Sequence, residues 1–198
     1  VDPEYFYSLK KYEAEPIFNS LENQKFFLFI GNPLDDYKNF NSALALSKNF
    51  NGIKIVLVSN TNIEKIKKKF ISYDLRNLII FKNISDTQLN FLYNKAVCLF
   101  YFSIYEGFGM PIIEAMMSGC PVISINNSSI SELIDKYPIK ITNQFELIDM
   151  SLEYIRKLDN SQYRLQVINE GLKISKEFTW DKCIKKTLSL YDKILSNP

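Results

Sequence analysis

The sequence predicts an α/β protein with a Rossmann-like, doubly wound parallel sheet of about six strands and helices on both faces. Three observations support this fold class. Short runs of Ile, Val, Leu and Phe lack polar alternation, which is typical of strands covered on both sides. Segments with a helical period alternate with these runs, which indicates βαβ units. A helical C-terminal segment follows the last apolar run.

The predicted elements alternate along the chain. Strands are expected at residues 25–31, 53–59, 78–81, 97–103 and 121–125. Helices are expected between them at 38–50, 62–72, 85–96 and 111–118, and after them at 145–158, 161–176 and 179–195. Thr179 is the expected N-cap of the last helix. The apolar face of that helix comprises Trp180, Cys183, Ile184, Leu188, Tyr191, Ile194 and Leu195.

Composition excludes several functional classes. The chain has 198 residues, enough for one domain with a real core, and 24 basic against 22 acidic residues, which gives no reason to expect a nucleic acid partner. Without histidine, this chain alone cannot build a Ser-His-Asp triad or a His-based zinc site. Cys98, Cys120 and Cys183 are too few and too scattered for a disulfide framework, which fits the reducing cytoplasm. No apolar run reaches the roughly 20 residues that span a bilayer.

The stretch YEGFGMPIIEAMMSGCPVI, residues 105–123, places two glutamates around a glycine-rich turn. Pro111 suits the first turn of a helix, so Glu106 is expected in the loop before that helix and Glu114 in its first or second turn. The unpaired N–H groups and the dipole of a helix start attract anions, and phosphate is the obvious candidate. Carboxylates repel phosphate and are better suited to accept hydrogen bonds from sugar or ribose hydroxyls. The pattern therefore suggests a nucleotide sugar.

Other interpretations of this stretch stay open at the level of the residues. Both glutamates could merely complement the helix dipole, by about 0.3–1 kcal/mol each. A dehydrogenase is a poorer match, because GFGMPI lacks the third glycine of GxGxxG and follows a late strand. Two carboxylates could also serve a glycoside hydrolase, whose assignment depends on a distance in three dimensions.

The stretch also resembles the signature of the family 4 retaining glycosyltransferases, which have the GT-B fold of two Rossmann-like domains. EGFGMPIIEAMMSGCPV matches every stated position of the family pattern E-G-F-G-x-P-x-x-E-A-M-x-x-G-x-P-V. The flanking stretches SDTQLNFLYNKAVCLFYFSIY, SSISEL and FTWDKCIKKTLSLYDKIL resemble the family as well. The resemblance covers nearly the whole chain from about Lys25.

The resemblance implies the C-terminal, donor-binding half of a GT-B enzyme. Residues 1–24 resemble the interdomain linker, and residues 25–178 the Rossmann-like nucleotide-sugar-binding domain. Residues 179–198 would form a C-terminal helix packing toward an N-terminal acceptor-binding domain that lies outside this sequence. The fragment alone is then expected to be inactive.

The family pattern also implies roles for individual residues. The two implied catalytic residues are Glu106 and Lys38. Glu106 would contact the donor sugar, and Lys38 would neutralise the diphosphate. The implied donor-binding residues are Gly107, Phe108, Gly109, Met110, Glu114 and Asn32. Within this set Glu114 would bind the ribose hydroxyls, and the backbone of the glycine turn would face the sugar and the distal phosphate. The resemblance also implies no metal and no cofactor, with Lys38 and the helix terminus supplying the positive charge that a metal supplies elsewhere.

Asn32 departs from the family, which usually has an arginine just after the glycine of the first loop. An amide offers dipoles without charge, whereas a guanidinium offers paired, charge-assisted donors. Leaving-group stabilisation is therefore expected to be weaker here, or to come from another cation.

The implied reaction transfers a hexose from a nucleoside-diphosphate sugar to a hydroxyl of a saccharide or lipid-linked acceptor, with retention of configuration. Synthesis of bacterial surface polysaccharide or lipopolysaccharide is the expected setting. The alternatives are a non-catalytic nucleotide-sugar-binding or scaffolding domain and, third, a GT-B sugar-nucleotide epimerase. The expected location is the cytoplasm, and peripheral association of the full-length protein with the inner face of the membrane is a further expectation.

Overall fold

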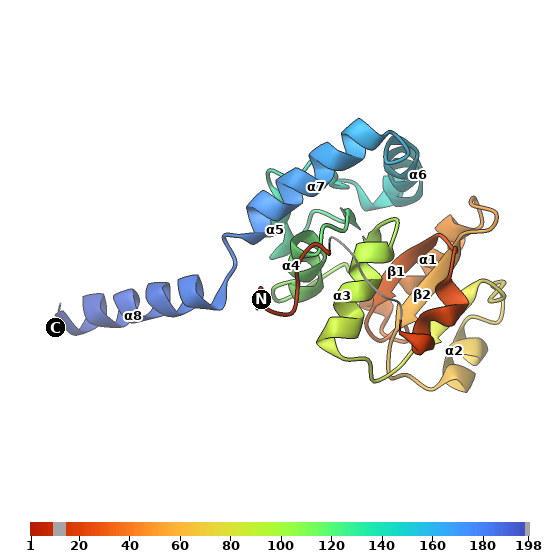
Figure 1. Ribbon diagram of the computed structural model, residues 1–198, viewed down its shortest axis with the longest axis horizontal. Coiled ribbons are helices and arrows are strands. Elements are labelled where there is room, and N and C mark those ends of the chain that lie inside the picture. Colours follow the sequence, from red (N-terminus) through yellow and green to blue (C-terminus); the bar gives the residue numbers. More distant parts are fainter. Residues whose placement is uncertain (10–14, 197–198) are drawn as a thin grey trace.

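A parallel sheet forms the centre of the molecule, and the computed structural model describes residues 1–9 and 15–196 (Figure 1). The strands are β1 (Phe26–Ile30), β2 (Lys54–Val58), β3 (Leu78–Phe81), β4 (Leu99–Tyr101) and β5 (Val122–Ser124), in the order β3-β2-β1-β4-β5. The predicted fold class is confirmed, with five strands in the described ranges rather than about six. An isolated parallel bridge between Ile125 and Ile141 lies where a sixth strand would extend the sheet.

The chain reverses its direction across the sheet between β3 and β4. It passes from β1 through α1 (Phe40–Ser47) to β2 and through α2 (Ile63–Lys69) to β3. α3 (Asp86–Lys95) then returns it to β4 on the other side of β1, and α4 (Met110–Met117) leads to β5. Because parallel crossovers are almost always right-handed, the reversal places α1 and α2 on one face and α3 and α4 on the other. Figure 1 shows α3 and α4 on the near side of the strands.

This reversal defines where a ligand is expected. β1 and β4 are neighbours in the sheet, and the loops that follow them lead to opposite faces. Doubly wound folds bind ligands in the crevice at the carboxyl ends of such strands.

Aromatic packing holds these strands in place. Phe27 of β1 stacks on Phe100 of β4 with ring centroids 4.6 Å apart, and Phe29 meets Phe40 of α1 edge-on at 4.7 Å. All four side chains are at most 2% exposed. Burial of a large apolar side chain contributes about 1.5–3 kcal/mol, so this cluster fixes the strands from which the site loops emerge.

Two details of the helix prediction were wrong. The helix expected at 38–50 begins at Phe40, because residues Asp36–Lys38 form the short 3-10 helix η2, and Asn39 then adopts a left-handed conformation with φ 56°. The short helix α5 (Ile130–Ile134) was not predicted, since five residues are too few for a clear helical period.

The C-terminal helices α6 (Leu147–Lys157) and α7 (Ser161–Ser175) confirm the predicted helical segment, with the 3-10 helix η3 (Gln144–Glu146) before them. α6 packs against α1, and α7 packs against α4. Arg164 of α7 donates hydrogen bonds to the carbonyls of Val97, at 2.8 Å, and Ala96, at 3.2 Å, just before β4. α7 is therefore anchored to the half of the sheet that carries α4.

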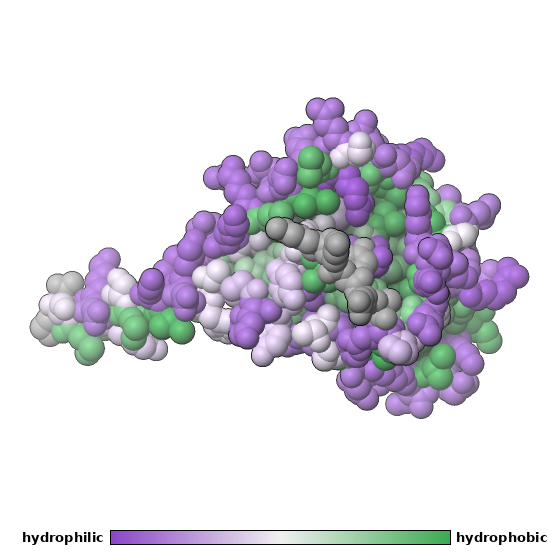
Figure 2. All heavy atoms as spheres, viewed as in Figure 1, coloured by the Kyte–Doolittle hydropathy of each residue, from purple (hydrophilic) through white to green (hydrophobic). Residues whose placement is uncertain are grey.

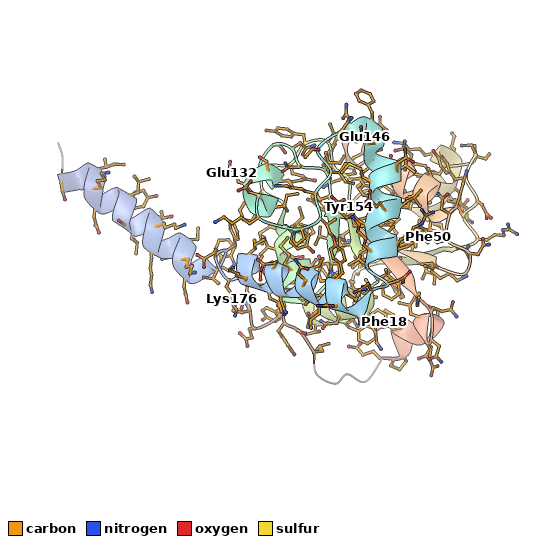
Figure 3. The ribbon with its side chains drawn as sticks, turned by 90° about the horizontal axis from the view of Figure 1, so that it is seen from above. Phe18, Phe50, Glu132, Glu146, Tyr154 and Lys176 are labelled. Atoms are coloured by element: carbon orange, nitrogen blue, oxygen red, sulfur yellow. The ribbon has the colours of Figure 1, made fainter. Side chains whose placement is uncertain are left out.

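α8 (Trp180–Ser196) behaves differently, because it extends away from the body of the molecule (Figures 1 and 3). The predicted N-cap is confirmed, since the Lys182 N–H donates to Thr179 Oγ1 at 3.3 Å. None of the residues Trp180–Ser196 is buried, and Trp180 itself is 57% exposed. The apolar stripe of α8 consists of Trp180, Ile184, Leu188, Tyr191, Ile194 and Leu195. Hydrophobic side chains along α8 are visible at the surface in Figure 2.

The predicted linker contributes to the core. Val1 and Phe6 are buried, as are Phe18 and Leu21 of the 3-10 helix η1 (Pro16–Leu21). Residues 10–14, within the predicted linker, and residues 197–198, at the end of the predicted C-terminal helix, lie outside the described residues.

Candidate active site

The loops after β1 and β4 meet at the switch point of the sheet. We call residues 31–39 the β1 loop and residues 102–109 the β4 loop. The backbone N–H of Ile104 donates to the carbonyl of Tyr37 at 2.8 Å, which joins the two loops directly. Two segments far apart in the sequence thus lie side by side at the carboxyl ends of β1 and β4.

Lys38 reaches from the β1 loop to the β4 loop. Its Nζ lies 2.5 Å from Glu106 Oε1, and the two side chains are only 15% and 14% exposed. The stem of Lys38 passes close over Gly31, where an added Cβ would lie 3.5 Å from Lys38 Cε. The ammonium also lies 5.2 Å from the ring centroid of Tyr37 and 5.6 Å from that of Tyr101. The predicted pair of catalytic residues is therefore in direct contact.

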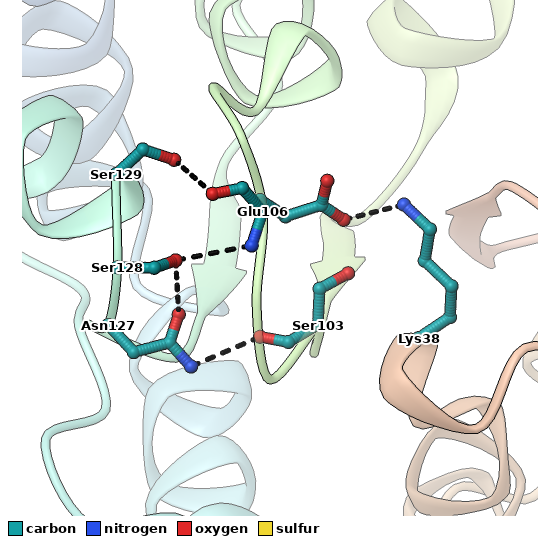
Figure 4. A network of polar contacts seen from close by, with 6 residues as sticks. All are labelled: Lys38, Ser103, Glu106, Asn127, Ser128 and Ser129. Atoms are coloured by element: carbon teal, nitrogen blue, oxygen red, sulfur yellow. Dashed lines mark hydrogen bonds and ion pairs between the residues drawn. The ribbon is translucent and has the colours of Figure 1, made fainter.

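The backbone around Glu106 is held by the segment before α5 (Figure 4). The Glu106 N–H donates to Ser128 Oγ at 3.2 Å, and Ser129 Oγ donates to the Glu106 carbonyl at 2.8 Å. Asn127 Nδ2 donates to the carbonyls of Ser103, at 3.3 Å, and Ile104, at 2.7 Å. These contacts fix the direction in which the Glu106 side chain leaves the loop.

The Glu106 carboxyl is stabilised in its charged form. Its partial burial alone would raise its pKa, but hydrogen bonds from Lys38, Ser103 and Tyr101 outweigh burial and lower that pKa below its usual range. Near neutral pH the crevice therefore contains a carboxylate and an ammonium side by side. The ammonium has three N–H donors, so Lys38 can hold Glu106 and still donate to an anion.

α4 begins directly beyond this pair. Gly109 precedes its first turn with φ +100°, and an added Cβ there would lie 3.2 Å from Leu133 Cδ1 of α5. Only glycine adopts this backbone conformation without strain. Gly107 and Phe108 are exposed, and Met110 and Pro111 open the helix. The N-terminal end of α4, with its partial positive charge, thus lies at the same edge of the sheet as Lys38 and Glu106.

Glu114 lies in the second turn of α4 and contacts α3. The hydroxyl of Tyr93 donates to Glu114 Oε2 at 2.9 Å. Burial raises the pKa of the Glu114 carboxyl, and the hydrogen bond from Tyr93 opposes that rise. The predicted helix position of Glu114 is confirmed, and Tyr93 is a partner that the sequence did not reveal.

Asn32 lies in the β1 loop but is turned toward its own loop and β2. Its Oδ1 accepts hydrogen bonds from the Leu34 N–H at 3.1 Å and from Thr61 Oγ1 at 2.8 Å. Its Nδ2 donates to Asp35 Oδ1 at 2.8 Å. In this structure the amide organises the loop that carries Lys38.

An apolar pocket of about 410 Å³ opens between the β4 loop and the start of α8. Phe108 and Met110 line it from one side, and Phe178, Trp180 and Cys183 from the other. Phe108 and Phe178 meet edge-on with centroids 6.0 Å apart. The pocket therefore links the glycine turn to the junction between α7 and α8.

The described residues contain neither a metal-binding cluster nor a membrane-spanning helix. Within residues 1–9 and 15–196, no three Cys, Asp or Glu side chains are grouped closely enough to hold a metal ion. In the same part of the chain, no helix combines the length and the apolar character needed to cross a membrane.

The structure brings most of the predicted site residues together, but Asn32 points away from the others. Lys38 and Glu106 touch, and Gly107, Phe108, Gly109, Met110 and Glu114 follow on the same loop and helix. Asn32 shares the loop of Lys38 but points to Thr61 and Asp35. The supporting residues Asn127, Ser128 and Ser129 were not predicted as part of the site. Ser128 and Ser129 belong to SSISEL, which follows the motif in sequence, and Asn127 directly precedes it.

Comparison with known proteins assigns the chain to a family. The sequence model of the family described as "Glycosyl transferases group 1" matches residues 11–173. The chain belongs to this glycosyltransferase family. The resemblance that the glutamate motif indicated is confirmed. Membership of this family does not support the interpretation of the chain as a dehydrogenase or as a glycoside hydrolase.

The chain matches only part of the length of its curated relatives. O-antigen chain mannosyltransferase B of Escherichia coli is 32% identical over 108 residues, which are 54% of this chain and 28% of that protein. O-antigen chain mannosyltransferase RfbU of Salmonella typhimurium is 33% identical over 106 residues, 52% of this chain and 30% of that protein. The glycosyltransferase chain thus spans about a third or less of either protein.

Solved structures confirm the fold. Sucrose-phosphate synthase from Thermosynechococcus elongatus superimposes with a TM-score of 0.80 at 18% identity, over 100% of this chain and 52% of that one. The C-terminal domain of a glycosyl transferase group 1 family protein (LpcC) from Francisella tularensis gives a TM-score of 0.66 at 18% identity, over 89% of this chain and 96% of that domain. The chain therefore has the Rossmann-like architecture of one half of a GT-B fold.

Proposed function

We propose that this chain is the donor-binding half of a retaining glycosyltransferase that transfers a hexose from a nucleoside-diphosphate sugar to an acceptor hydroxyl. The observation that carries the proposal is the contact between Lys38 and Glu106 at the switch point, 2.5 Å from Nζ to Oε1, made by the loop that leads into the N-terminus of α4. A cation, a carboxylate and a helix terminus thus come together at one edge of the sheet. A diphosphate bound to a polyhydroxylated sugar offers an anion to the cation and the helix terminus, and hydroxyl donors to the carboxylate.

The proposed roles follow from the chemistry of each group. Lys38 and the first turn of α4 stabilise the diphosphate and the charge that develops on it as it leaves. Glu106, held ionised by Lys38, accepts hydrogen bonds from the donor sugar. Glu114 accepts hydrogen bonds from the ribose. The backbone of Gly107, Phe108 and Gly109, continued by Met110, faces the sugar and the distal phosphate. The acceptor hydroxyl then attacks on the face from which the phosphate departs and gives its proton to that phosphate. The bond from the sugar to the phosphate oxygen is thus replaced by a bond to the acceptor oxygen on the same face, so the configuration is retained.

The relatives narrow the proposed substrate. Two of them are named O-antigen chain mannosyltransferases. We accordingly propose mannose as the transferred sugar and a growing surface polysaccharide or a lipid-linked saccharide as the acceptor. The acceptor site is assigned to a second domain of the same protein, against which α8 packs. The exposed apolar stripe of α8 supports this assignment.

Binding of the nucleotide tests the donor half. Isothermal titration calorimetry of this chain with GDP, UDP and ADP should show binding of one of them. Glu114→Ala should weaken it by at least about tenfold, as expected for the loss of a hydrogen bond to a charged group. Glu153→Ala, which removes an exposed carboxylate of α6, is the matched control and should bind as wild type does. Absence of binding by the wild-type chain at millimolar nucleotide would contradict the proposal.

A non-catalytic sugar-nucleotide-binding domain is the second candidate, favoured by one observation. Asn32 carries no charge, and its amide nitrogen donates to Asp35, so a second cation for the leaving phosphate is missing from that position. Product analysis with the full-length protein separates the candidates. Formation of a glycoside that Glu106→Ala abolishes supports the transferase. Release of free sugar and nucleotide without acceptor would indicate an epimerase instead.

A further inference from the structure

A buried tyrosine stands directly behind Glu114. Tyr93 of α3 is 0% exposed, and its hydroxyl donates to Glu114 Oε2 at 2.9 Å. A buried phenolic hydroxyl needs a hydrogen-bond partner, and here that partner is a carboxylate at the edge of the proposed donor site. The contact therefore couples the core of the domain to one functional side chain.

The ring of Tyr93 is itself held in place. Phe6 meets it edge-on with centroids 6.1 Å apart, and Phe6 is buried. The segment around Phe6 is tied to α3 at two points, because the Tyr7 N–H donates to Asn90 Oδ1 at 3.3 Å and the Leu9 N–H donates to Asn94 Oδ1 at 2.8 Å. The phenol therefore cannot swing away without disturbing both α3 and this segment.

We propose that Tyr93 is a positioning residue for the donor site: its hydroxyl holds Oε2 of Glu114, so that Oε1 is presented to the hydroxyls of the nucleotide sugar. This inference rests on the proposed function, because that function assigns Glu114 to donor hydroxyls. A rigid carboxylate with one committed oxygen gives a directional acceptor, whereas a free side chain loses rotamer entropy on binding.

Protonation of Glu114 supplies a readout that packing alone would not move. Burial raises the pKa of Glu114, and the hydrogen bond from Tyr93 is the main opposing contribution. The other groups facing it are Asp86, which raises the pKa, the amino group of Val1, which lowers it, and the hydroxyl of Tyr101. Loss of the Tyr93 hydroxyl should therefore raise the pKa of Glu114 further. As the pH falls, the Glu114 carboxylate should then become protonated at a higher pH than in wild type, and it would no longer accept hydrogen bonds from the ligand as a charged group.

The test compares Tyr93→Phe with Tyr137→Phe. Tyr137 is also buried, but its hydroxyl accepts from the Val122 N–H at 2.9 Å, so it serves as the control. Calorimetry with the nucleoside diphosphate that binds best should show roughly three- to tenfold weaker binding for Tyr93→Phe near neutral pH. The loss should grow as the pH falls to about 5, because more Glu114 is then protonated. Tyr137→Phe should bind as wild type does at each pH.

A double-variant cycle decides whether Tyr93 acts through Glu114. In a Glu114→Gln background, Tyr93→Phe should cause little further loss, and the pH dependence of that loss should disappear. An equal loss in both backgrounds, with the same pH profile, would overturn the proposal and leave Tyr93 as a packing residue.

A ligand-free measurement separates this proposal from the proposed function. The side-chain carboxyl ¹³C resonance of Glu114, titrated without nucleotide, should have a higher midpoint in Tyr93→Phe than in wild type. If the wild-type chain binds no nucleoside diphosphate, the donor function fails and the positioning role fails with it. An unchanged midpoint overturns the Tyr93 proposal even where nucleotide binding is intact.

Discussion

The β1 loop and the β4 loop contribute one catalytic candidate each, but they are held in different ways. In the β1 loop, Lys69 donates to the Leu34 carbonyl at 2.6 Å and pairs with Asp36, whose side chain is 94% exposed. The β4 loop is fixed by hydrogen bonds from Asn127 and its neighbours and ends at the left-handed turn of Gly109. A contact between solvent-exposed side chains contributes little to the stability of a loop, whereas a contact between partly buried groups contributes more. The two loops should therefore respond very differently to substitution.

The largest effect is expected where the two loops meet. Lys38→Met leaves the Glu106 carboxylate largely buried without its cation, so the free energy of unfolding near neutral pH should fall by about 2–3 kcal/mol. Urea denaturation measures this loss. Lys38→Met combined with Glu106→Gln should recover most of it, since no charge is then left unpaired. A double variant as unstable as the single one would contradict the prediction.

Acid should reduce the same difference between wild type and Lys38→Met. The pKa of Glu106 is lowered in the folded protein from its ordinary value of 4.5. Its stabilising contribution is therefore complete above that ordinary value and is lost as the pH falls through the lowered pKa. Denaturation curves of both proteins, collected from neutral pH down to about pH 3, should converge at the acid end.

A somewhat smaller effect is expected at the turn before α4. Gly109→Ala forces φ +100° on a residue with a Cβ and places that Cβ 3.2 Å from Leu133, so the free energy of unfolding should fall by about 2 kcal/mol. Gly107→Ala is the matched control, because an added Cβ there meets nothing within 4 Å. Thermal unfolding of the two variants tests the difference, and equal stabilities would show that the backbone at Gly109 relaxes.

The support behind the β4 loop should matter less. Asn127→Ala removes the hydrogen bonds to the carbonyls of Ser103 and Ile104, and the free energy of unfolding should fall by about 1 kcal/mol. Ser128→Ala removes the acceptor of the 3.2 Å hydrogen bond from the Glu106 N–H and should cost less. Chemical denaturation ranks the two variants, and the opposite order would place the main support at Ser128.

The smallest effect is expected in the β1 loop. Lys69→Met breaks an ion pair whose side chains are 33% and 94% exposed, so the free energy of unfolding should fall by no more than about 0.5 kcal/mol. Denaturation in low and high salt provides the measurement, with Lys67→Met, which removes an exposed helical pair, as the control. A loss as large as that of Asn127→Ala would mean that the two loops are held equally firmly.

The contrast between the loops also explains what the sequence could predict. Glycine and proline at fixed positions determine the backbone of the β4 loop and the start of α4. The positions of Glu106 in the loop and of Gly109 before the helix could therefore be predicted from residue types alone. The strands could also be predicted from the sequence, because short continuous apolar runs bounded by turn residues are typical of strands covered on both faces of a sheet. The ion pair between Lys38 and Glu106 joins residues 68 positions apart and depends on the order of the strands.

Other features had no local signal. The late start of α1 follows from the left-handed conformation of Asn39, which the residue type permits but does not require. Tyr93 has the appearance of an ordinary core aromatic in the sequence, and only its contact with Glu114 distinguishes it. The orientation of Asn32 depends on Thr61, which follows a different strand.

The pocket beside α8 gives the protein a selective chemical handle. Cys98 and Cys120 are buried, which raises the pKa of both thiols, whereas Cys183 is exposed on α8 and lines the pocket next to Phe108. Thiol reagents should therefore modify Cys183 first, since reactivity requires both access and ionisation. A fluorophore attached there would sit between the glycine turn and the helix that leaves the body. Its emission could report nucleotide binding on one side and the docking of α8 on the other, without any alteration of the crevice that holds Lys38 and Glu106.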